Sequence, residues 1–200
     1  MSKTDLTKRA ITEAFVEVLN EKPLAKITVS DISERCGISR NTFYYHYQDV
    51  LALLEELCEY EFDSVVRQYP EINSIEECLE ALTSFARDNK RAIMHIYASE
   101  NQATYTASLW RMCEYVVTAY AKSAFGDAPV SDEDKKLFIR FYKCACYGMF
   151  IDWIGNGMKE EYVQGLLRVC KLKKGTADLI IENSRTHSHA PEHEISASPY

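Results

Sequence analysis

Glycine and proline are scarce in this 200-residue chain, which has seven glycines and five prolines. So few helix-breaking residues, together with 46% hydrophobic residues, favour helices that bury a sizeable core. No run of 18 apolar residues occurs, and the polar first residues are not followed by an apolar stretch. We therefore expect no membrane span, no signal peptide and a cytoplasmic protein.

Motifs of catalysis and metal binding are also missing. The sequence has no Gly-x-Ser-x-Gly, no glycine-rich phosphate loop and no His-Glu-x-x-His. Its seven cysteines are irregularly spaced, and on a helix Cys144 and Cys146 would point about 200° apart, unsuited to one metal ion. We expect mostly buried free thiols, no cofactor, no metal and no enzymatic activity.

Positive charge is not in excess, because the formal net charge is −7. Residues 1–50 contain seven basic and seven acidic residues, so the remainder carries the whole negative excess. A neutral first segment and an acidic remainder are compatible with DNA held by few phosphate contacts. The charge alone gives no positive evidence for DNA binding.

What the sequence does contain is a corner of two short helices over residues 28–47. Thr28 and Asp31 have the spacing of a capping box at the start of the first helix. Gly37 is placed to end that helix in the left-handed conformation, with Ile38 packing back onto it. The first helix therefore has both a start signal and a stop signal.

The second helix of the corner begins after Ser39, which can cap it. Phe43 and Tyr47 lie four residues apart and predict its inner side. The outer side then holds Arg40, Asn41, Tyr44 and Tyr45. Two such helices joined by a short glycine-containing turn match the helix-turn-helix, whose second helix enters the major groove. A solvated or protein-binding face is the alternative interpretation.

Residues 11–57 resemble the DNA-binding domain of the TetR/AcrR regulators. The resemblance is carried by a first amphipathic helix over residues 6–19 and by three motifs: Ile27-Thr28-Val29-x-Asp31-Ile32, Cys36-Gly37-Ile38-Ser39 and Thr42-Phe43-Tyr44-Tyr45-His46-Tyr47. It implies that Thr28 and Ser30 approach the DNA backbone and that Tyr45 and His46 contact phosphates. The residues implied to contact base edges are Arg40, Asn41, Thr42 and Tyr44. Arginine suits guanine and asparagine suits adenine, whereas hydroxyl and imidazole groups suit phosphates.

One position departs from the family pattern. Many members carry a lysine where Val50 stands, so one phosphate contact is expected to be missing. The free amides at the start of the next helix remain to receive that phosphate, although Asp49 as N-cap occupies part of them.

The apolar periodicity predicts an all-α chain. We expect further helices over residues 49–68, 75–88, 90–97, 103–125, 131–156, 160–171 and 177–183. The apolar side of the first of these is expected to comprise Leu51, Leu54, Leu57, Cys58, Phe62 and Val65. The domains are then an N-terminal three-helix helix-turn-helix domain over 1–50, joined by the helix of about 49–68 to a helical effector-binding and dimerisation bundle over 51–185. A polar, proline-broken stretch over 186–200 is expected to be a disordered tail.

Aromatic residues are dense on the helices after residue 90. They can enclose a small-molecule pocket, although stripes at helical spacing also form ordinary core. His95, Trp110 and Tyr147 are the candidate effector-binding residues. For His95, a hydrogen-bonded structural role is the alternative.

Residues 141–160 carry a second resemblance, to the TetR subgroup that includes activators of dihydroxyacetone-kinase operons, through Tyr147-Gly148, Trp153-Ile154 and Gly157-Met158-Lys159-Glu160. Some members of that subgroup respond to a protein instead of a metabolite. Gly148 permits close helix approach in a dimer seam or, alternatively, local packing.

Together these observations predict a homodimeric transcriptional regulator. We expect it to bind a pseudo-palindromic double-stranded DNA operator and to respond to a small-molecule or protein effector, without a membrane. By the family resemblance, repression is the more common mode of regulation. The rival hypotheses are a helical sensor or adaptor that docks a protein without binding DNA and, less favoured, an enzyme built on the second domain.

Overall fold

The computed structural model describes residues 3–187, and within that range every regular element is a helix. The elements are α1 (Lys3–Glu21), the 3-10 turn η1 (Leu24–Lys26), α2 (Val29–Cys36), α3 (Arg40–His46), α4 (Val50–Gln68), α5 (Ile75–Asp88), α6 (Lys90–Tyr97), α7 (Gln102–Phe125), α8 (Asp132–Gly155), α9 (Glu160–Leu172) and α10 (Thr176–His187). The predicted all-α class is confirmed. Of the tail predicted over 186–200, residues 188–200 lie outside the described residues, and residues 186–187 belong to the end of α10.

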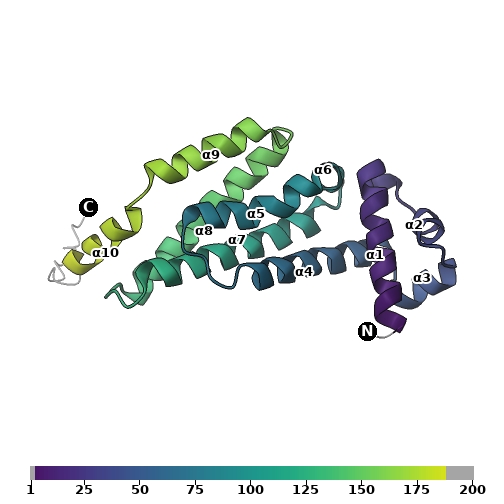
Figure 1. Ribbon diagram of the computed structural model, residues 1–200, viewed down its shortest axis with the longest axis horizontal. Coiled ribbons are helices and arrows are strands. Elements are labelled where there is room, and N and C mark those ends of the chain that lie inside the picture. The colour runs from purple at the N-terminus through teal and green to yellow at the C-terminus, as the bar shows by residue number, and fades with distance from the viewer. Residues whose placement is uncertain (1–2, 188–200) are drawn as a thin grey trace, which may run out of the picture.

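The molecule is elongated (Figure 1). Helices α1 to α3 gather at one end and are called the head below, whereas α4 to α10 form the body. α4 runs from the head along the body, α1 crosses near its head end, and α10 lies at the opposite end of the molecule. α4 is therefore the covalent connection between the two parts, as the sequence predicts for residues 49–68.

The head has its own hydrophobic core. Ile11, Phe15, Ile32 and Phe43 are completely buried there, and they come from α1, α2 and α3. Burying such side chains stabilises the fold by roughly 1.5–3 kcal/mol each. Two residues of α6, Ala92 and Ile96, belong to the same cluster, so the body packs directly against the head.

α4 contributes to the cores of both parts, and its buried face includes the predicted Leu54, Leu57, Cys58 and Val65 but differs at its first turn. Leu51, expected on the apolar side, is 38% exposed, whereas Leu53 is completely buried in the head cluster. The first turns of α4 pack against the head and Val65 packs into the body. A single periodicity cannot describe a helix whose two halves face different partners.

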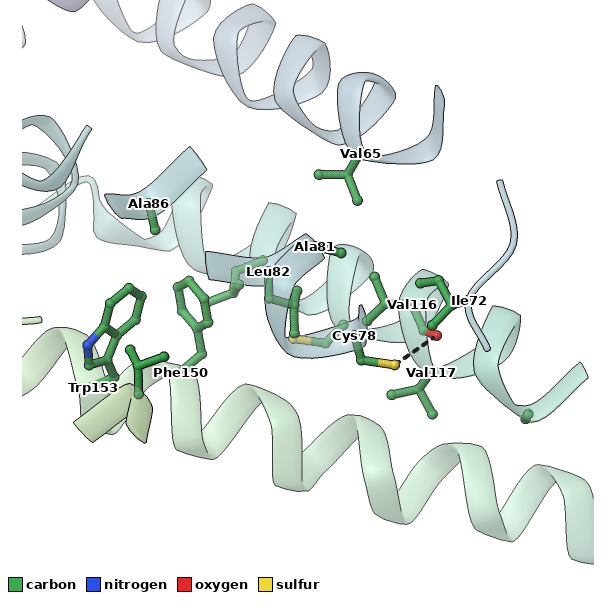
Figure 2. Close-up of a cluster of buried hydrophobic side chains, with 14 of the residues drawn as sticks. Val65, Ile72, Cys78, Ala81, Leu82, Ala86, Val116, Val117, Phe150 and Trp153 are labelled. Atoms are coloured by element: carbon green, nitrogen blue, oxygen red, sulfur yellow. Dashed lines mark hydrogen bonds between the residues drawn. The ribbon is translucent and has the colours of Figure 1, made fainter. Parts of the chain in front are cut away.

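The body core lies between α4, α5, α7 and α8 (Figure 2). Trp153 and Phe150 of α8 pack at one end of it, and the Cys78 thiol of α5 lies 3.6 Å from the carbonyl oxygen of Val116 in α7. Cys58, Cys78 and Cys113 are buried, as expected for structural thiols, but Cys144 is exposed. Within residues 3–187, no helix has the length and apolar character needed to cross a bilayer.

Candidate nucleic-acid interface

The helix-turn-helix corner begins with a reciprocal cap. The backbone N–H of Asp31 donates to the Thr28 hydroxyl at 3.3 Å, and that of Thr28 donates to the Asp31 carboxylate at 2.7 Å. Lys22 of the neighbouring segment lies 2.6 Å from the same carboxylate. Lys22 and then Thr28 lower the pKa of Asp31 from 3.8 to about 2, so the carboxylate stays ionised and the start of α2 stays fixed.

The turn between α2 and α3 depends on the backbone of Gly37. This residue has φ of 70°, in the left-handed region, and the N–H of Ile38 donates back to the Ser33 carbonyl at 2.9 Å. An added Cβ at Gly37 would meet nothing within 4 Å. Glycine is therefore required by the conformation and not by lack of space.

α3 is held by its inner side and by a hydrogen bond to α4. Phe43 is fully buried, and Tyr47, also buried, donates from its hydroxyl to Glu56 at 2.8 Å. Lys8 of α1 donates to the other oxygen of Glu56 at 2.7 Å. One carboxylate of α4 thus ties together the first helix and the end of the recognition helix. The Ser39 hydroxyl accepts from the Thr42 N–H at 3.1 Å and caps α3 as predicted.

The outer side of α3 presents most of the predicted DNA-contacting residues together. Tyr45 is 80% exposed and Tyr44 is 56% exposed, and Arg40 and Asn41 are exposed beside them. The half-buried His46 ring packs edge-on against Tyr45, with ring centroids 5.0 Å apart. The structure therefore gathers these five candidate residues on a single helix.

The other three candidates are already engaged or recessed. The Thr42 hydroxyl lies 2.9 Å from that of Ser39, and the exposed Thr28 hydroxyl bonds to Asp31 at 2.7 Å. Ser30 is half-buried at the start of α2. Hydroxyls in such bonds keep lone pairs or rotate, so Thr28 and Thr42 retain the capacity for one further contact.

The start of α4 explains the absence of the usual lysine. Val50 packs against the head core, and Asp49 accepts the Ala52 N–H at 2.8 Å as N-cap. An apolar side chain is useful at this position because it completes the core, although it contributes no phosphate contact.

Most cations of the head are neutralised within the chain. Four of the described basic residues pair with carboxylates at 2.6–3.1 Å: Lys8 with Glu56, Arg9 with Glu13, Lys22 with Asp31, and Arg35 with Glu17 and Glu21. Among the head side chains that the structure describes, Lys26 and Arg40 have no such ion pair. The pairing accounts for the neutral charge of the first 50 residues and leaves few cations for phosphates.

The predicted effector residues do not meet at one site. His95 places Nδ1 2.6 Å from the Leu19 carbonyl oxygen, which makes it a link between α6 and α1. Trp110 and Tyr147 do meet, edge-on at 5.1 Å, and Lys143 lies over the Trp110 ring at 4.4 Å. Trp110 lines an open depression between α7 and α8, beside charged residues such as Glu114 and Lys136. None of the three lines the apolar cavities described next.

An apolar cavity of about 50 Å³ lies where the head meets the body. We call it the junction cavity. Residues from six helices line it, including Val16 of α1, Leu57 and Glu61 of α4, Ile96 of α6 and Tyr105 of α7. Tyr105 packs against the hydrophobic clusters of both head and body. A second apolar cavity of about 110 Å³ lies between α5, α8 and α9.

Sequence reasoning missed Glu61 because the surrounding run, Glu59-Tyr60-Glu61-Phe62-Asp63, looks like a solvated face. The available signal was register, since Glu61 lies three and four residues from Cys58 and Val65, both buried. Burial raises the pKa of Glu61 to about 7.

Comparison with known proteins identifies the two parts of the chain. Residues 11–57 match the model of the tetR family of bacterial regulatory proteins, and residues 73–175 match that of a TetR-type transcriptional regulator C-terminal region. The chain belongs to the TetR family. It is therefore a helix-turn-helix transcriptional regulator and not an enzyme, and both resemblances predicted from its motifs are confirmed.

Curated relatives support this membership of the TetR family. The chain is 24% identical over 168 residues to the HTH-type dhaKLM operon transcriptional activator DhaS of Lactococcus lactis subsp. lactis strain IL1403, covering 82% of this chain and 89% of DhaS. It is 36% identical over 53 residues to the uncharacterized HTH-type regulator YerO of Bacillus subtilis strain 168, covering 26% of this chain and 18% of YerO. The second similarity thus covers about a quarter of this chain.

Solved structures show the same TetR fold. The dihydroxyacetone kinase operon activator DhaS superposes with a TM-score of 0.66 at 20% identity, covering 90% of this chain and 97% of that one. GusR of Salmonella enterica gives 0.60 at 14% identity, covering 92% and 98%. At these identities the likeness concerns the arrangement of helices alone.

Proposed function

We propose that this TetR-family regulator binds a pseudo-palindromic operator as a homodimer, and that an effector bound to its body changes this binding. The observation that carries the proposal is the exposed face of α3, where Arg40, Asn41, Tyr44 and Tyr45 stand together on a helix fixed by Phe43. A short helix anchored from behind and polar in front is the geometry that reads a major groove.

The contacts divide by chemistry. Arg40 and Asn41 have the bidentate groups that read guanine and adenine, and Thr42 and Tyr44 supply hydroxyls and apolar surface for the remaining base edges. On the backbone, phosphates are received by Tyr45 and His46 on one side and by Thr28 and Ser30 on the other. The placement of the eight residues at one end of the molecule supports these proposed roles.

The dimer seam is proposed on the outer side of α8. Leu137, Phe141, Cys144 and Gly148 recur there at spacings of four, three and four, and all four are exposed in the protomer. An added Cβ at Gly148 would meet no atom within 4 Å, so packing inside the protomer does not require glycine. An apolar helical stripe with one small residue suits a close, symmetric contact with a second copy.

α9 supplies the rest of the proposed seam. Val169 and Leu172 are exposed apolar residues on it, and Leu167 is half-buried. Tyr162 hydrogen-bonds to Asp152 of α8, whereas Leu166 lines the cavity between α5, α8 and α9. A four-helix contact of α8 and α9 with their counterparts would cover these groups.

The effector site is proposed at the junction cavity in place of the Trp110, Tyr147 and His95 set. A ligand there touches α1, α4 and α6 at once, whereas the surface beside Trp110 touches only α7 and α8. An effector shifts the DNA-binding equilibrium only by its differential affinity for the two head positions. Contact with the connecting helix gives such a difference a physical origin.

The direction of regulation is proposed to be activation. The similarity to DhaS, named as an activator and matched over 89% of its length, supports activation over the repression that the family pattern favours. A transcriptional reporter with and without the regulator decides between the two.

A mobility-shift assay with DNA flanking the regulator's own gene tests the core of the proposal. We expect a specific complex that survives excess unrelated DNA and is lost in Tyr44→Ala. Light scattering should give a mass of two chains for the free protein. If no flanking or genomic fragment is retained and the body still binds another protein, the adaptor hypothesis replaces the DNA-binding one.

A further inference from the structure

Glu61 occupies a position on α4 that belongs to the apolar stripe. Leu54, Leu57, Glu61 and Val65 follow one another at helical spacing, and all four line the junction cavity. Glu61 is half-buried there, and a carboxylate that loses part of its hydration is normally paired with another group. Its presence in this stripe therefore requires an explanation.

The described part of the chain provides no partner for this carboxylate. Among the side chains that the structure describes, none forms an ion pair or a hydrogen bond with Glu61. Its neighbours on the same helix are paired, since Glu56 binds Lys8 and Tyr47, and Glu59 lies 2.5 Å from Arg111. Glu61 thus differs from Glu56 and Glu59 in lacking a cation, and from the exposed Glu55 and Asp63 in being half-buried.

A second residue with a polar group also lines the cavity. Tyr105 of α7 lines it, and its hydroxyl has no hydrogen-bond partner among the described residues. Most of the remaining lining is apolar and includes Ile93, Leu109 and Met112. An apolar wall with a few convergent polar groups is the usual composition of a small-molecule site.

We propose that the junction cavity binds an apolar organic cation, an amine with an aryl or alkyl body, whose ammonium group pairs with Glu61. This inference rests on the effector role proposed above for the cavity. The ammonium N–H groups would donate to the carboxylate and to the Tyr105 hydroxyl oxygen, and the apolar body would contact Leu57, Ile93 and Leu109.

The size of the cavity connects binding to movement. Its volume is about 50 Å³, and a cavity of about 150 Å³ is needed to hold a benzene ring. An amine with an aromatic body therefore enters only if α4 separates from α6 and α7. The ligand then favours a protein conformation in which the connecting helix has moved.

Calorimetry with three matched probes tests the charge preference on the full chain. The probes are 4-phenylbutylamine, 4-phenylbutan-1-ol and 4-phenylbutyrate, which share an apolar body and carry a cation, no charge and an anion. At pH 8 we expect the amine to bind at least about tenfold more tightly than the alcohol, and the carboxylate not to bind. Equal binding of amine and alcohol, or no binding of any probe, would overturn the proposal.

Two variants locate the preference on one residue. In Glu61→Gln the amine should bind no more tightly than the alcohol, whereas in Glu55→Gln, the same change at an exposed position of α4, the preference should persist.

If Glu61→Gln unfolds, the preference of the unmodified protein should fall between pH 8 and pH 6 as Glu61 is protonated. The other titratable groups of the cavity, Cys58 and Tyr105, have raised pKa values and stay neutral in that range. A preference that survives in Glu61→Gln or is constant over this pH range contradicts the proposal.

The operator assay separates this inference from the proposed function. If the chain binds operator DNA but shows no amine preference, the regulator proposal stands and the ligand class is wrong. If amines bind at Glu61 but no DNA is retained, the ligand site stands and the regulatory role fails. When both hold, 4-phenylbutylamine should shift the operator affinity of the unmodified protein and leave that of Glu61→Gln unchanged.

Discussion

The Nδ1 atom of His95 lies 2.6 Å from the carbonyl oxygen of Leu19, so a body helix donates a hydrogen bond to a head helix. A second bond joins the same two helices, because the Ala92 N–H donates to the Asn20 side-chain oxygen at 3.3 Å. α6 and α1 are thus connected at two points beside the junction cavity.

Replacing His95 with Phe should loosen this connection without removing the ring. We expect a loss of about 0.5–1.5 kcal/mol of stability, the usual value of one hydrogen bond, and a weaker effector response at unchanged DNA affinity. Denaturant unfolding and operator titrations measure the two effects. Arg91→Ala, an exposed change on the same helix, is the control. Unchanged coupling in His95→Phe would show that the bond is only structural.

The recognition helix makes a second prediction. Tyr44→Ala and Arg40→Ala should each cost about 1–3 kcal/mol of discrimination between operator and unrelated DNA, because they remove base contacts. His46→Ala should instead weaken all sequences alike. Circular dichroism should show an unchanged fold for Tyr44→Ala and Arg40→Ala, because both positions are exposed. If both variants kept operator selectivity, α3 would be misassigned.

The ion pairs of the head predict an unusually weak salt dependence. Among the described side chains of the head, Lys26 and Arg40 are the two cations per protomer without an ion pair, so a dimer brings about four free cations to the DNA and the slope of log K against log salt should be about −4. Lys26→Gln should make the slope shallower by about 2, since the dimer loses two cations. Arg9→Gln, whose guanidinium already pairs with Glu13, should change it little. A slope near −8 would mean that the internal pairs open on DNA.

The proposed seam on α8 predicts that Phe141→Glu yields monomers. Phe141 is 62% exposed in the protomer, and a charge there would be desolvated in a symmetric contact. Tyr60→Glu is a matched control, because Tyr60 is aromatic and 59% exposed but lies on α4. Light scattering across a concentration series gives the mass. A dimeric Phe141→Glu protein would place the seam elsewhere.

The half-buried carboxylate of Glu61 predicts how stability depends on pH. Its folded pKa of about 7 is above the ordinary 4.5, so the folded protein holds this proton more tightly than the unfolded chain. The stabilisation is fully present below pH 4.5 and is lost as the pH rises through 7, by at most about 2–3 kcal/mol. Glu61→Gln should therefore unfold at higher denaturant than the unmodified protein at pH 8 and show no such loss. Identical pH profiles for the two proteins would mean that a cation already pairs with Glu61.

The sequence predicts the local elements well because their signals are local. Thr28 with Asp31, Gly37 and Ser39 each specify a cap or turn within four residues, and the structure has those caps. The same reasoning fails where the partner is distant. The hydrogen bond from His95 joins residues 76 positions apart, and no periodicity indicates that Leu19 lies opposite.

The burial of Glu61 and Leu51 is predicted wrongly for a related reason. Charge and hydropathy assign Glu61 to solvent and Leu51 to the core, but α4 turns different faces to the head and to the body. Only the three-dimensional packing of α1, α6 and α7 around α4 determines which face is enclosed. The sequence likewise suggests an effector pocket at Trp110 and Tyr147. In the structure their rings pack against each other, and Trp110 lies at the surface between α7 and α8.

The bond network at Glu56 gives the molecule a mechanical property. Because this carboxylate holds Lys8 and Tyr47 together, the recognition helix cannot turn independently of α4, and the connecting helix works as a rigid lever. Its 19 residues span about 28 Å at 1.5 Å per residue. A tilt of about 10° about the body end would carry the head by about 5 Å. That travel exceeds the rise of about 3.4 Å between base pairs, so an angular change too small to disturb the body core is enough to take α3 out of register with its half-site.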